Sequence, residues 1–180
     1  MQSIFLFAFV KRNMKHTYAF IDGQNLHQWL SRAIDYKKFR IYLRDKYKVT
    51  KAYYFLWFQE QENHLYETLQ DAWFILVFNL KGEHLKSSKK WNVDTNIVFH
   101  IMKKLIEWEF QWALLISGDG DYKMVVDYLV EKKKLTKVLC PNLRFSSSLY
   151  RNAKNLDPKY FDYIDKKDIQ KKISYTKKAP

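Results

Sequence analysis

Carboxylates directly follow two apolar segments of this sequence. Asp22 ends the run TYAFID, and the run WALLIS leads into Asp119 and Asp121 within the segment GDGD. A carboxylate in such a position is costly to bury unless it is paired, hydrogen-bonded or bound to a cation. If both runs are central strands of a parallel sheet, their carboxyl ends meet at one edge, where sheets of this kind bind ligands. We therefore expect the three side chains to lie close together.

A fourth carboxylate, Asp94, is expected to reach the same edge from a helix. Ile97 and Ile101 follow helical spacing and mark a buried face, which Asp94 extends toward the amino end of the helix. Each acid also has a simpler interpretation when taken alone. Asp94 and Asp121 suit the first turn of a helix, where acids are favoured, and Asp22 could accept hydrogen bonds from the loop after its strand.

Taken as a set, the four aspartates predict a metal site. Carboxylates gathered at one edge would repel one another and raise one another's pKa unless a divalent cation lay among them. Hard oxygen ligands suit Mg²⁺ or Mn²⁺, and no cluster of Cys and His residues suggests zinc. A metal held in this way activates water and stabilises a leaving oxygen, which is the chemistry that phosphodiester hydrolysis needs.

The charge balance favours a polyanionic partner. The 180 residues include 32 Lys and Arg against 19 Asp and Glu, a formal net charge of +13. Lys86, Lys89 and Lys90 lie in a basic segment just before Asp94, and with Trp91 they are candidate contacts to phosphates and to a base. The alternative is a solvated lysine loop. No apolar run approaches the roughly 18 residues that span a bilayer, so a membrane partner is not expected.

Apolar and amphipathic segments alternate from residue 17 onward. The apolar runs predict strands at Thr17–Asp22, Lys51–Phe58, Trp73–Leu80, Trp112–Ser117 and Thr136–Cys140, with Tyr160–Ile164 as an edge strand or docking segment. Helical spacing predicts helices at Asn25–Ala33, Tyr36–Tyr47, Glu62–Ala72, Asp94–Glu107, Asp121–Lys133 and Ser146–Ala153. This alternation predicts an α/β fold, a three-layer α-β-α sandwich around a mainly parallel sheet with Rossmann-like topology. Aromatic residues inside the strands, Trp73 among them, are expected in the core.

The chain is expected to hold one domain with two flanking segments. Residues 1–13 form an apolar extension that we leave outside the fold, with Met14 as an alternative initiator, and residues 14–165 form the domain. Residues 166–180 hold six lysines and one acid, so we expect a disordered basic tail. The single cysteine, Cys140, fits a buried strand and a reducing, cytoplasmic location.

The sequence resembles the NYN family, the LabA-like branch of the PIN-domain ribonucleases. The matching segments are FIDGQNL, VDTNIVFHIM and SGDGDYKMVVDYL, and with the late segment SSSLYRNAKNL they extend over about residues 16–165 in the expected order. The resemblance implies a PIN-like fold and metal-dependent, endoribonuclease-type cleavage of RNA. It also implies metal ligation by Asp22, Asp94 and Asp119, with Asp121 as a further ligand or a neighbouring acid.

Two more residues take roles from the resemblance. Asn25 matches the family's asparagine after the first aspartate and is expected to orient the site or touch substrate. Ser117 matches the small hydroxyl residue before the Gly-Asp pair and is a candidate substrate contact. The extended basic stretch before Asp94 departs from the family pattern, which puts substrate choice rather than chemistry in question.

Two other functions compete with the ribonuclease. A haloacid-dehalogenase-type phosphatase needs a second aspartate two residues after Asp22, but Gln24 stands there and a general acid is missing. A non-catalytic RNA-binding module would keep the fold, although such a module would normally have lost a carboxylate and this chain has all four. We therefore predict a metal-dependent ribonuclease, with single-stranded DNA as an alternative substrate. The RNA class, the metal count, homo-oligomer formation and any regulatory partner are left open by the sequence.

Overall fold

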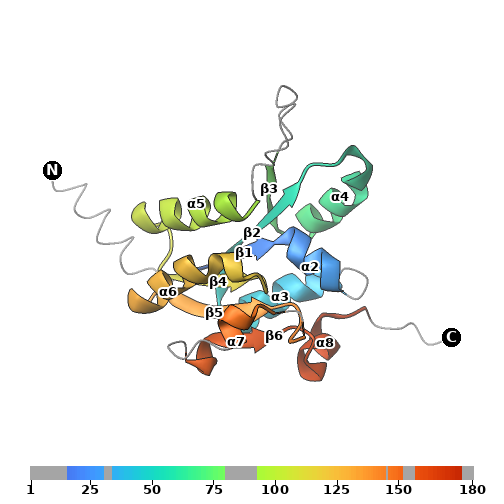
Figure 1. Ribbon diagram of the computed structural model, residues 1–180. Coiled ribbons are helices and arrows are strands. Elements are labelled where there is room, and N and C mark those ends of the chain that lie inside the picture. Colours follow the sequence, from blue (N-terminus) through green and yellow to red (C-terminus); the bar gives the residue numbers. More distant parts are fainter. Residues whose placement is uncertain (1–15, 31–33, 80–92, 145, 152–156, 176–180) are drawn as a thin grey trace.

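A six-stranded parallel sheet forms the centre of the protein, in the strand order β3-β2-β1-β4-β5-β6 (Figure 1). The computed structural model describes residues 16–30, 34–79, 93–144, 146–151 and 157–175. The strands are β1 (Thr17–Asp22), β2 (Val49–Trp57), β3 (Ile75–Asn79), β4 (Trp112–Ile116), β5 (Leu135–Cys140) and β6 (Phe161–Tyr163). The order reverses at β1, which places the switch point of the sheet between β1 and β4.

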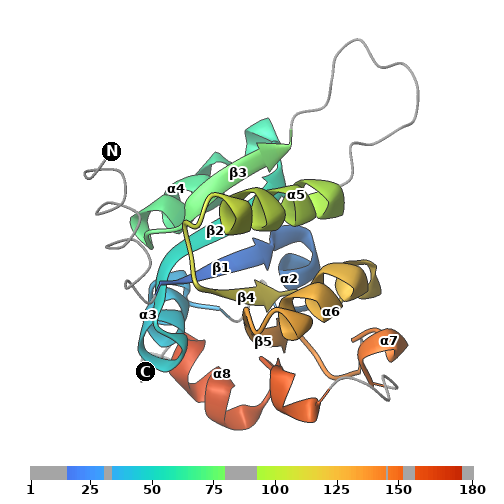
Figure 2. The same cartoon turned by 90° about the vertical axis from the view of Figure 1, so that its left-hand side faces the viewer.

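Helices connect successive strands and cover both faces of the sheet (Figures 1 and 2). The α-helices are α2 (Gly23–Leu30), α3 (Tyr36–Tyr47), α4 (Asn63–Asp71), α5 (Val93–Ile106), α6 (Lys123–Glu131), α7 (Ser148–Arg151) and α8 (Lys167–Ile173). Single 3₁₀ turns are η1 (Glu60–Glu62), η2 (Gly120–Tyr122) and η3 (Pro158–Tyr160). The predicted three-layer α-β-α sandwich with a parallel sheet is therefore confirmed.

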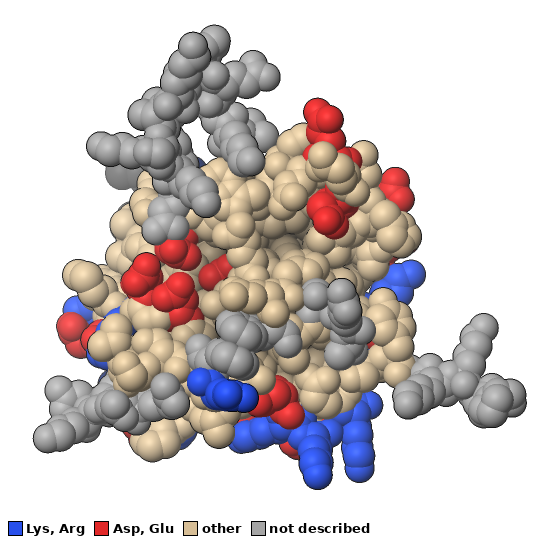
Figure 3. All heavy atoms as spheres, turned by 45° about the vertical axis from the view of Figure 1, so that its right-hand side comes forward, with Lys and Arg blue, Asp and Glu red and all other residues tan. Residues whose placement is uncertain are grey.

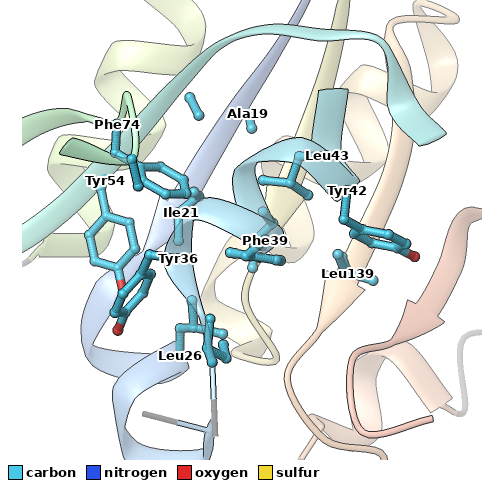
Figure 4. Packing of buried hydrophobic residues seen from close by; sticks show 14 of the residues in the cluster. Ala19, Ile21, Leu26, Tyr36, Phe39, Tyr42, Leu43, Tyr54, Phe74 and Leu139 are labelled. Atoms are coloured by element: carbon cyan, nitrogen blue, oxygen red, sulfur yellow. The ribbon is translucent and has the colours of Figure 1, made fainter. Parts of the chain in front are cut away.

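Two hydrophobic cores flank the sheet, because successive residues of a strand point to opposite faces. In β1, Ala19 and Ile21 pack with α2, α3, α4 and α8, while Tyr18 and Phe20 pack with α5 and α6. Figure 4 shows the first of these cores, in which aromatic rings from α3, from β2 and from Phe74, the residue before β3, meet β1. Because both faces are covered, β1 is buried along its whole length, including Asp22 at its end.

The transition from β1 to α2 requires glycine. A Cβ atom at Gly23 would lie 2.5 Å from the backbone oxygen of Phe55 and 2.5 Å from Cε1 of Tyr54. Only a residue without a side chain lets the chain turn from the end of β1 directly into a helix against β2. This close approach fixes how Asp22 and the first turn of α2 are presented at the carboxyl edge of the sheet.

The third strand was predicted to begin too early, at Trp73. The sequence predicted a strand from Trp73, but β3 begins at Ile75, and Trp73 lies in the turn after α4 with φ 64° and 82% of its surface exposed. The apolar run WFILVFNL has no polar residue to mark its start, so the run alone could not show that its first residue belongs to a helix terminus. The second strand ends similarly early, since Phe58 follows β2 and is exposed.

Three helices differ from the predictions by more than one residue at an end. The first helix begins at Gly23 rather than Asn25, the helix predicted from Asp121 opens with the 3₁₀ turn η2, and the last predicted helix covers only Ser148–Arg151. The predicted ends of the first and last helices, at 31–33 and 152–153, lie outside the described residues, as do residues 1–15.

The basic tail is partly folded, which corrects the expected disorder from residue 166. Helix α8 buries Ile169 and Ile173 against α3, and Ile34 pairs with Ser174 in an antiparallel bridge. The amide of Asp35 donates to the Ile173 carbonyl oxygen at 2.7 Å. Lysine-rich composition suggested a solvated segment, but two isoleucines at helical spacing are enough to dock a short helix. Residues 176–180 lie outside the described residues.

Cys140 ends β5 and is buried, as predicted, and its burial raises the pKa of its thiol to about 12. A thiol in this environment is protonated at neutral pH and therefore inert. Among the described residues, no helix has both the length and the apolar composition that crossing a bilayer requires.

The docking of α8 can be tested by replacing Ile173 with Ala. The side chain is fully buried, so we expect the free energy of unfolding to fall by about 2–5 kcal/mol. Lys171→Ala, an exposed change in the same helix, serves as the control and should change stability by less than about 0.5 kcal/mol. Denaturant unfolding measures both. Equal stability of the two variants would show that residues 167–173 do not belong to the folded unit.

Candidate functional site

Three carboxylates gather at the carboxyl edge of the sheet. Asp94 lies in the first turn of α5, Asp119 precedes η2 and Asp121 lies within η2, and each offers an oxygen within 4.8 Å of the others. Figure 3 shows acidic side chains grouped on one face of the molecule, while the described lysines and arginines in this view lie mainly along the lower edge. The two segments meet because β4 ends beside β1, at the switch point of the sheet.

Asp22 lies beside this group but is buried, with only 5% of its surface exposed. Its Oδ1 accepts a hydrogen bond from the Asn25 amide at 3.0 Å, so part of its role is the loop contact that a residue after a strand can make. Its Oδ2 accepts from the Ser117 hydroxyl and from the Tyr122 hydroxyl, each at 3.2 Å. Asp22 is thus held by groups from the segment that follows β1 and from the segment that follows β4.

Tyr122 joins Asp22 to Asp94, a half-buried member of the carboxylate group. Its hydroxyl oxygen lies 2.5 Å from Oδ1 of Asp94 and 3.2 Å from Oδ2 of Asp22, and the side chain is fully buried. A phenol has a single proton to donate, so it cannot satisfy two ionised carboxylates fully at the same time. Burial and the adjacent charges of Asp22 and Asp94 raise the pKa of Tyr122 well above its usual range, which keeps it a donor.

The turn after β4 is braced by two polar side chains. Oδ1 of Asn25 accepts from the Gly118 amide at 2.9 Å, and the Ser117 hydroxyl oxygen accepts from the Asp119 amide at 3.1 Å. Asp119 in turn caps η2 by accepting from the Asp121 amide at 3.1 Å. These bonds set the direction in which the carboxylates of Asp119 and Asp121 leave the backbone.

Burial raises the pKa of Asp22 to about 6, and the negative charge of Asp94 adds to the rise. The three hydrogen bonds from Asn25, Tyr122 and Ser117 work in the opposite direction because they favour the ionised form. Desolvation wins, so without a cation the site binds a proton more tightly than an exposed aspartate does.

The donor set fits a hard divalent cation. Three carboxylates with oxygens within 4.8 Å approach the span across a Mg²⁺ octahedron, about 4.2 Å from twice the metal–oxygen distance. The group contains only oxygen donors. Mg²⁺ and Mn²⁺ prefer such ligands, whereas zinc and copper are typically bound by imidazole or thiolate groups. Asp121 is exposed, so the group opens to solvent on one side.

The predicted site residues divide into those that come together and those that do not. Asp94, Asp119 and Asp121 form one group, while Asp22 stands behind it, linked through Tyr122. Ser117 was a candidate substrate contact, but it is fully buried and bonded to Asp22, so it braces the site instead. The candidate contacts Lys86, Lys89, Lys90 and Trp91 lie outside the described residues.

Tyr122 was missed by the sequence reasoning, although a signal for it exists. If Asp121 lay on the buried face of the next helix, Met124 and Val125 would be buried three and four residues after it, but Met124 is exposed. The buried positions are Val125 and Val126, three and four residues after Tyr122. The helical face is therefore shifted by one residue, which turns Tyr122 inward and Asp121 outward.

The comparison with protein families agrees with this arrangement, since the model of the NYN domain matches residues 16–157. The chain belongs to the NYN domain family. NYN domains are PIN-like nucleases, and the aspartate group of this NYN domain lies within the matched residues. The comparison does not distinguish the LabA-like branch from others.

A solved structure shares the fold of this NYN domain. The crystal structure of a protein of unknown function from Vibrio parahaemolyticus matches with a TM-score of 0.66 and 19% sequence identity, over 85% of this chain and 95% of that one. At this identity the similarity supports the fold alone. No curated protein sequence matches the chain.

The raised pKa of Asp22 predicts a pH-dependent stability without added metal. Between pH 3.8 and about 6 the folded protein holds a proton on Asp22 that the unfolded chain releases. The free energy of unfolding should therefore fall as pH rises through this window, by about 1.4 kcal/mol per pH unit and about 3 kcal/mol in all. In Asp22→Asn this contribution is absent, so the stability of the variant relative to wild type should rise from pH 4 to 6 and then level off.

Denaturant unfolding in EDTA between pH 4 and 8 measures this difference. Asp162→Asn is the matched control. Burial raises the pKa of Asp162, but the hydrogen bonds from Lys166 and the Tyr163 amide and the charges of Lys166 and Lys46 lower it further, so its difference from wild type should be flat over the window. If the difference in stability between Asp22→Asn and wild type were also independent of pH, Asp22 would be ionised throughout this range and the prediction would be wrong.

Proposed function

We propose that the protein is an endoribonuclease-type hydrolase that uses Mg²⁺ or Mn²⁺ to cleave RNA phosphodiester bonds. The observation that supports this most directly is the group of Asp94, Asp119 and Asp121, whose oxygens lie within 4.8 Å of one another in a member of a nuclease family. The group stands at the edge of a parallel sheet where ligands bind, and it opens to solvent on the side of Asp121.

Each acid has a distinct part in this proposal. Asp94, Asp119 and Asp121 would hold the cation, and the buried carboxylate of Asp22 would add negative charge beside them. When bound, the cation would activate a water molecule and stabilise the leaving oxygen of the phosphodiester. Asn25 and Ser117 hold the Gly118–Asp119 turn, so they act as positioning residues for two of the carboxylates.

Tyr122 orients the oxygen of Asp94 that it contacts. Its hydroxyl donates to that carboxylate from a fully buried position, which restrains how the carboxylate is oriented. In proteins that bind metals, such outer partners fix ligand orientation. Asp121 has no such restraint from Tyr122 and is the exposed member, so it is the acid nearest to an incoming phosphate.

RNA is proposed as the substrate on charge and family grounds. The chain holds 32 Lys and Arg against 19 Asp and Glu, and the resulting net charge of +13 attracts a polyanion. Lys86, Lys89, Lys90 and Trp91 precede Asp94 in the sequence and remain candidate contacts to the strand. Single-stranded DNA offers the same phosphates, so cleavage of the two polymers has to be compared directly.

Replacing Asp119 with Asn tests the catalytic proposal. The change removes a charged ligand but keeps a good helix cap, so the fold should survive while metal-dependent cleavage falls at least about a hundredfold. The measurement is cleavage of labelled RNA and single-stranded DNA with Mg²⁺, Mn²⁺ or EDTA, beside a melting curve. Asp127→Asn is the control, because Asp127 is an exposed acid on α6 paired with Lys123.

Two outcomes would contradict the proposal. Wild-type protein that binds RNA but cuts it with none of the metals would identify a non-catalytic RNA-binding module. Asp119→Asn that cuts as well as Asp127→Asn would show that Asp119 serves only as the cap of η2.

Tyr122→Phe tests whether the shared hydroxyl positions the metal ligands. We expect Mn²⁺ affinity to fall by about 10–100-fold, because Asp94 and Asp22 lose the donor that orients them. Titration calorimetry with Mn²⁺ measures the affinity. Tyr150→Phe is the matched control, since Tyr150 is buried nearby and, among the described residues, its hydroxyl has no hydrogen-bond partner. Equal Mn²⁺ affinity of the two variants would leave Tyr122 as a packing residue only.

A further inference from the structure

A basic hollow lies on the face of the sheet that α3 and α4 cover, away from the aspartate group. Its volume is about 550 Å³. It is lined by three cations, one acid and an exposed indole, with two apolar residues between them: Lys37, Arg40, Arg44, Asp71, Trp73, Ile41 and Ala72. Asp94 and Asp121 instead come from elements that pack on the opposite face. The hollow is therefore separate from the candidate metal site.

Packing does not explain why a tryptophan stands at position 73. Its backbone has φ 64°, a left-handed conformation in which glycine or asparagine costs least, and 82% of its surface is exposed. A large apolar side chain in this position pays a conformational cost and gains little burial. Strained residues of this kind often mark functional surfaces.

The backbone that carries Trp73 is held firmly in place. The Arg40 guanidinium donates to the carbonyl oxygens of Trp73 at 3.4 Å, Val49 at 3.3 Å and Thr50 at 3.0 Å. These bonds tie the turn before β3 to the start of β2. The indole is thus presented to solvent from a fixed backbone rather than from a loose loop.

Two further cations flank this fixed indole. Lys37 and Arg44 lie three residues before and four residues after Arg40, which puts all three on one side of α3. Arg44 forms an ion pair with Asp45, but both side chains are more than 60% exposed. An ion pair this exposed to water is weak, so a phosphate can replace Asp45 as the partner of Arg44.

We propose that this hollow binds single-stranded RNA outside the catalytic group, with a base stacked on Trp73 and phosphates held by Lys37 and Arg44. An exposed aromatic platform between cations is the arrangement that binds single strands with little sequence preference. The inference rests on the proposed function, since it names a second contact for the same substrate. It adds a surface that holds the strand while another part of it reaches the carboxylates.

A second hollow provides a natural comparison. It has a volume of about 690 Å³ and contains Trp108, which is 65% exposed and has φ 57°, so the two tryptophans share backbone conformation and exposure. Here, however, Glu107 and Glu109 also line the walls, with Lys51 close to Glu109. This balance of charge does not favour a polyanion. Trp108 is therefore a matched control for Trp73.

The test measures binding of a fluorescent single-stranded RNA of about 30 nucleotides in EDTA, where no cleavage can occur. Trp73→Ala should weaken binding about tenfold and Trp73→Phe should restore most of it, while Trp108→Ala should bind like wild type. Replacing Lys37 and Arg44 together by Ala should lower the slope of log affinity against log salt by about 1.4, from two lost phosphate contacts. Lys167→Ala with Lys171→Ala is the control for loss of charge alone, since both side chains are exposed on α8.

The outcomes separate this inference from the nuclease proposal. Loss of binding in Trp73→Ala, with melting temperature unchanged, supports the hollow even if wild-type protein never cuts RNA. Equal affinity of Trp73→Ala and Trp108→Ala overturns it, even if cleavage is observed. A change in molecular mass by light scattering in Trp73→Ala, without a change in RNA affinity, would assign the hollow to self-association and would also overturn it.

Discussion

Repulsion among carboxylates at one edge of the sheet is the constraint on which the functional part of this structure depends. Asp94, Asp119 and Asp121 have carboxylate oxygens within 4.8 Å of one another, so their negative charges repel unless a cation lies among them. Asp22 adds a buried charge behind them. Three groups donate hydrogen bonds to the Asp22 carboxylate and stabilise its charge: the hydroxyls of Tyr122 and Ser117 and the amide of Asn25.

The parallel sheet makes this concentration of charge possible. Parallel strands end at one edge, and the helices that follow begin there with free backbone amides, so acids gathered at this edge meet partial positive charge. Gly23 contributes by letting α2 start without a connecting loop, which brings Asn25 within reach of the turn after β4. A sheet of antiparallel strands would separate these ends.

The opposite edge of the sheet has a different chemistry. All four described non-glycine residues with positive φ, Lys48, Trp73, Trp108 and Lys133, lie where a helix ends and leads into the next strand. Lysines there compensate the negative ends of helix dipoles. Tryptophans have no such role, so the charges around them matter. Three cations and one acid surround Trp73, whereas Trp108 lies beside two glutamates and one lysine. One fold thus presents an acidic edge and, opposite it, an edge of mixed charge that carries aromatic side chains.

The sequence by itself determined the layered α/β fold and the edge at which the aspartates meet, because continuous apolar runs specify buried parallel strands and residues after them must lie at the carboxyl edge. It also marked Cys140 as buried. Only the tertiary structure decided that Asp22 withdraws behind the other three acids, that Tyr122 rather than Asp121 faces inward, and that Ser117 is sealed from solvent. It likewise decided that Trp73 leaves the strand and that Ile169 and Ile173 dock a lysine-rich segment. Most of these outcomes depend on contacts between segments far apart in the chain, which local patterns of hydrophobicity and charge do not record. The inward position of Tyr122 depends instead on a shift of one residue in a helical face, and the sequence offers Met124 with Val125 as readily as Val125 with Val126 for that face.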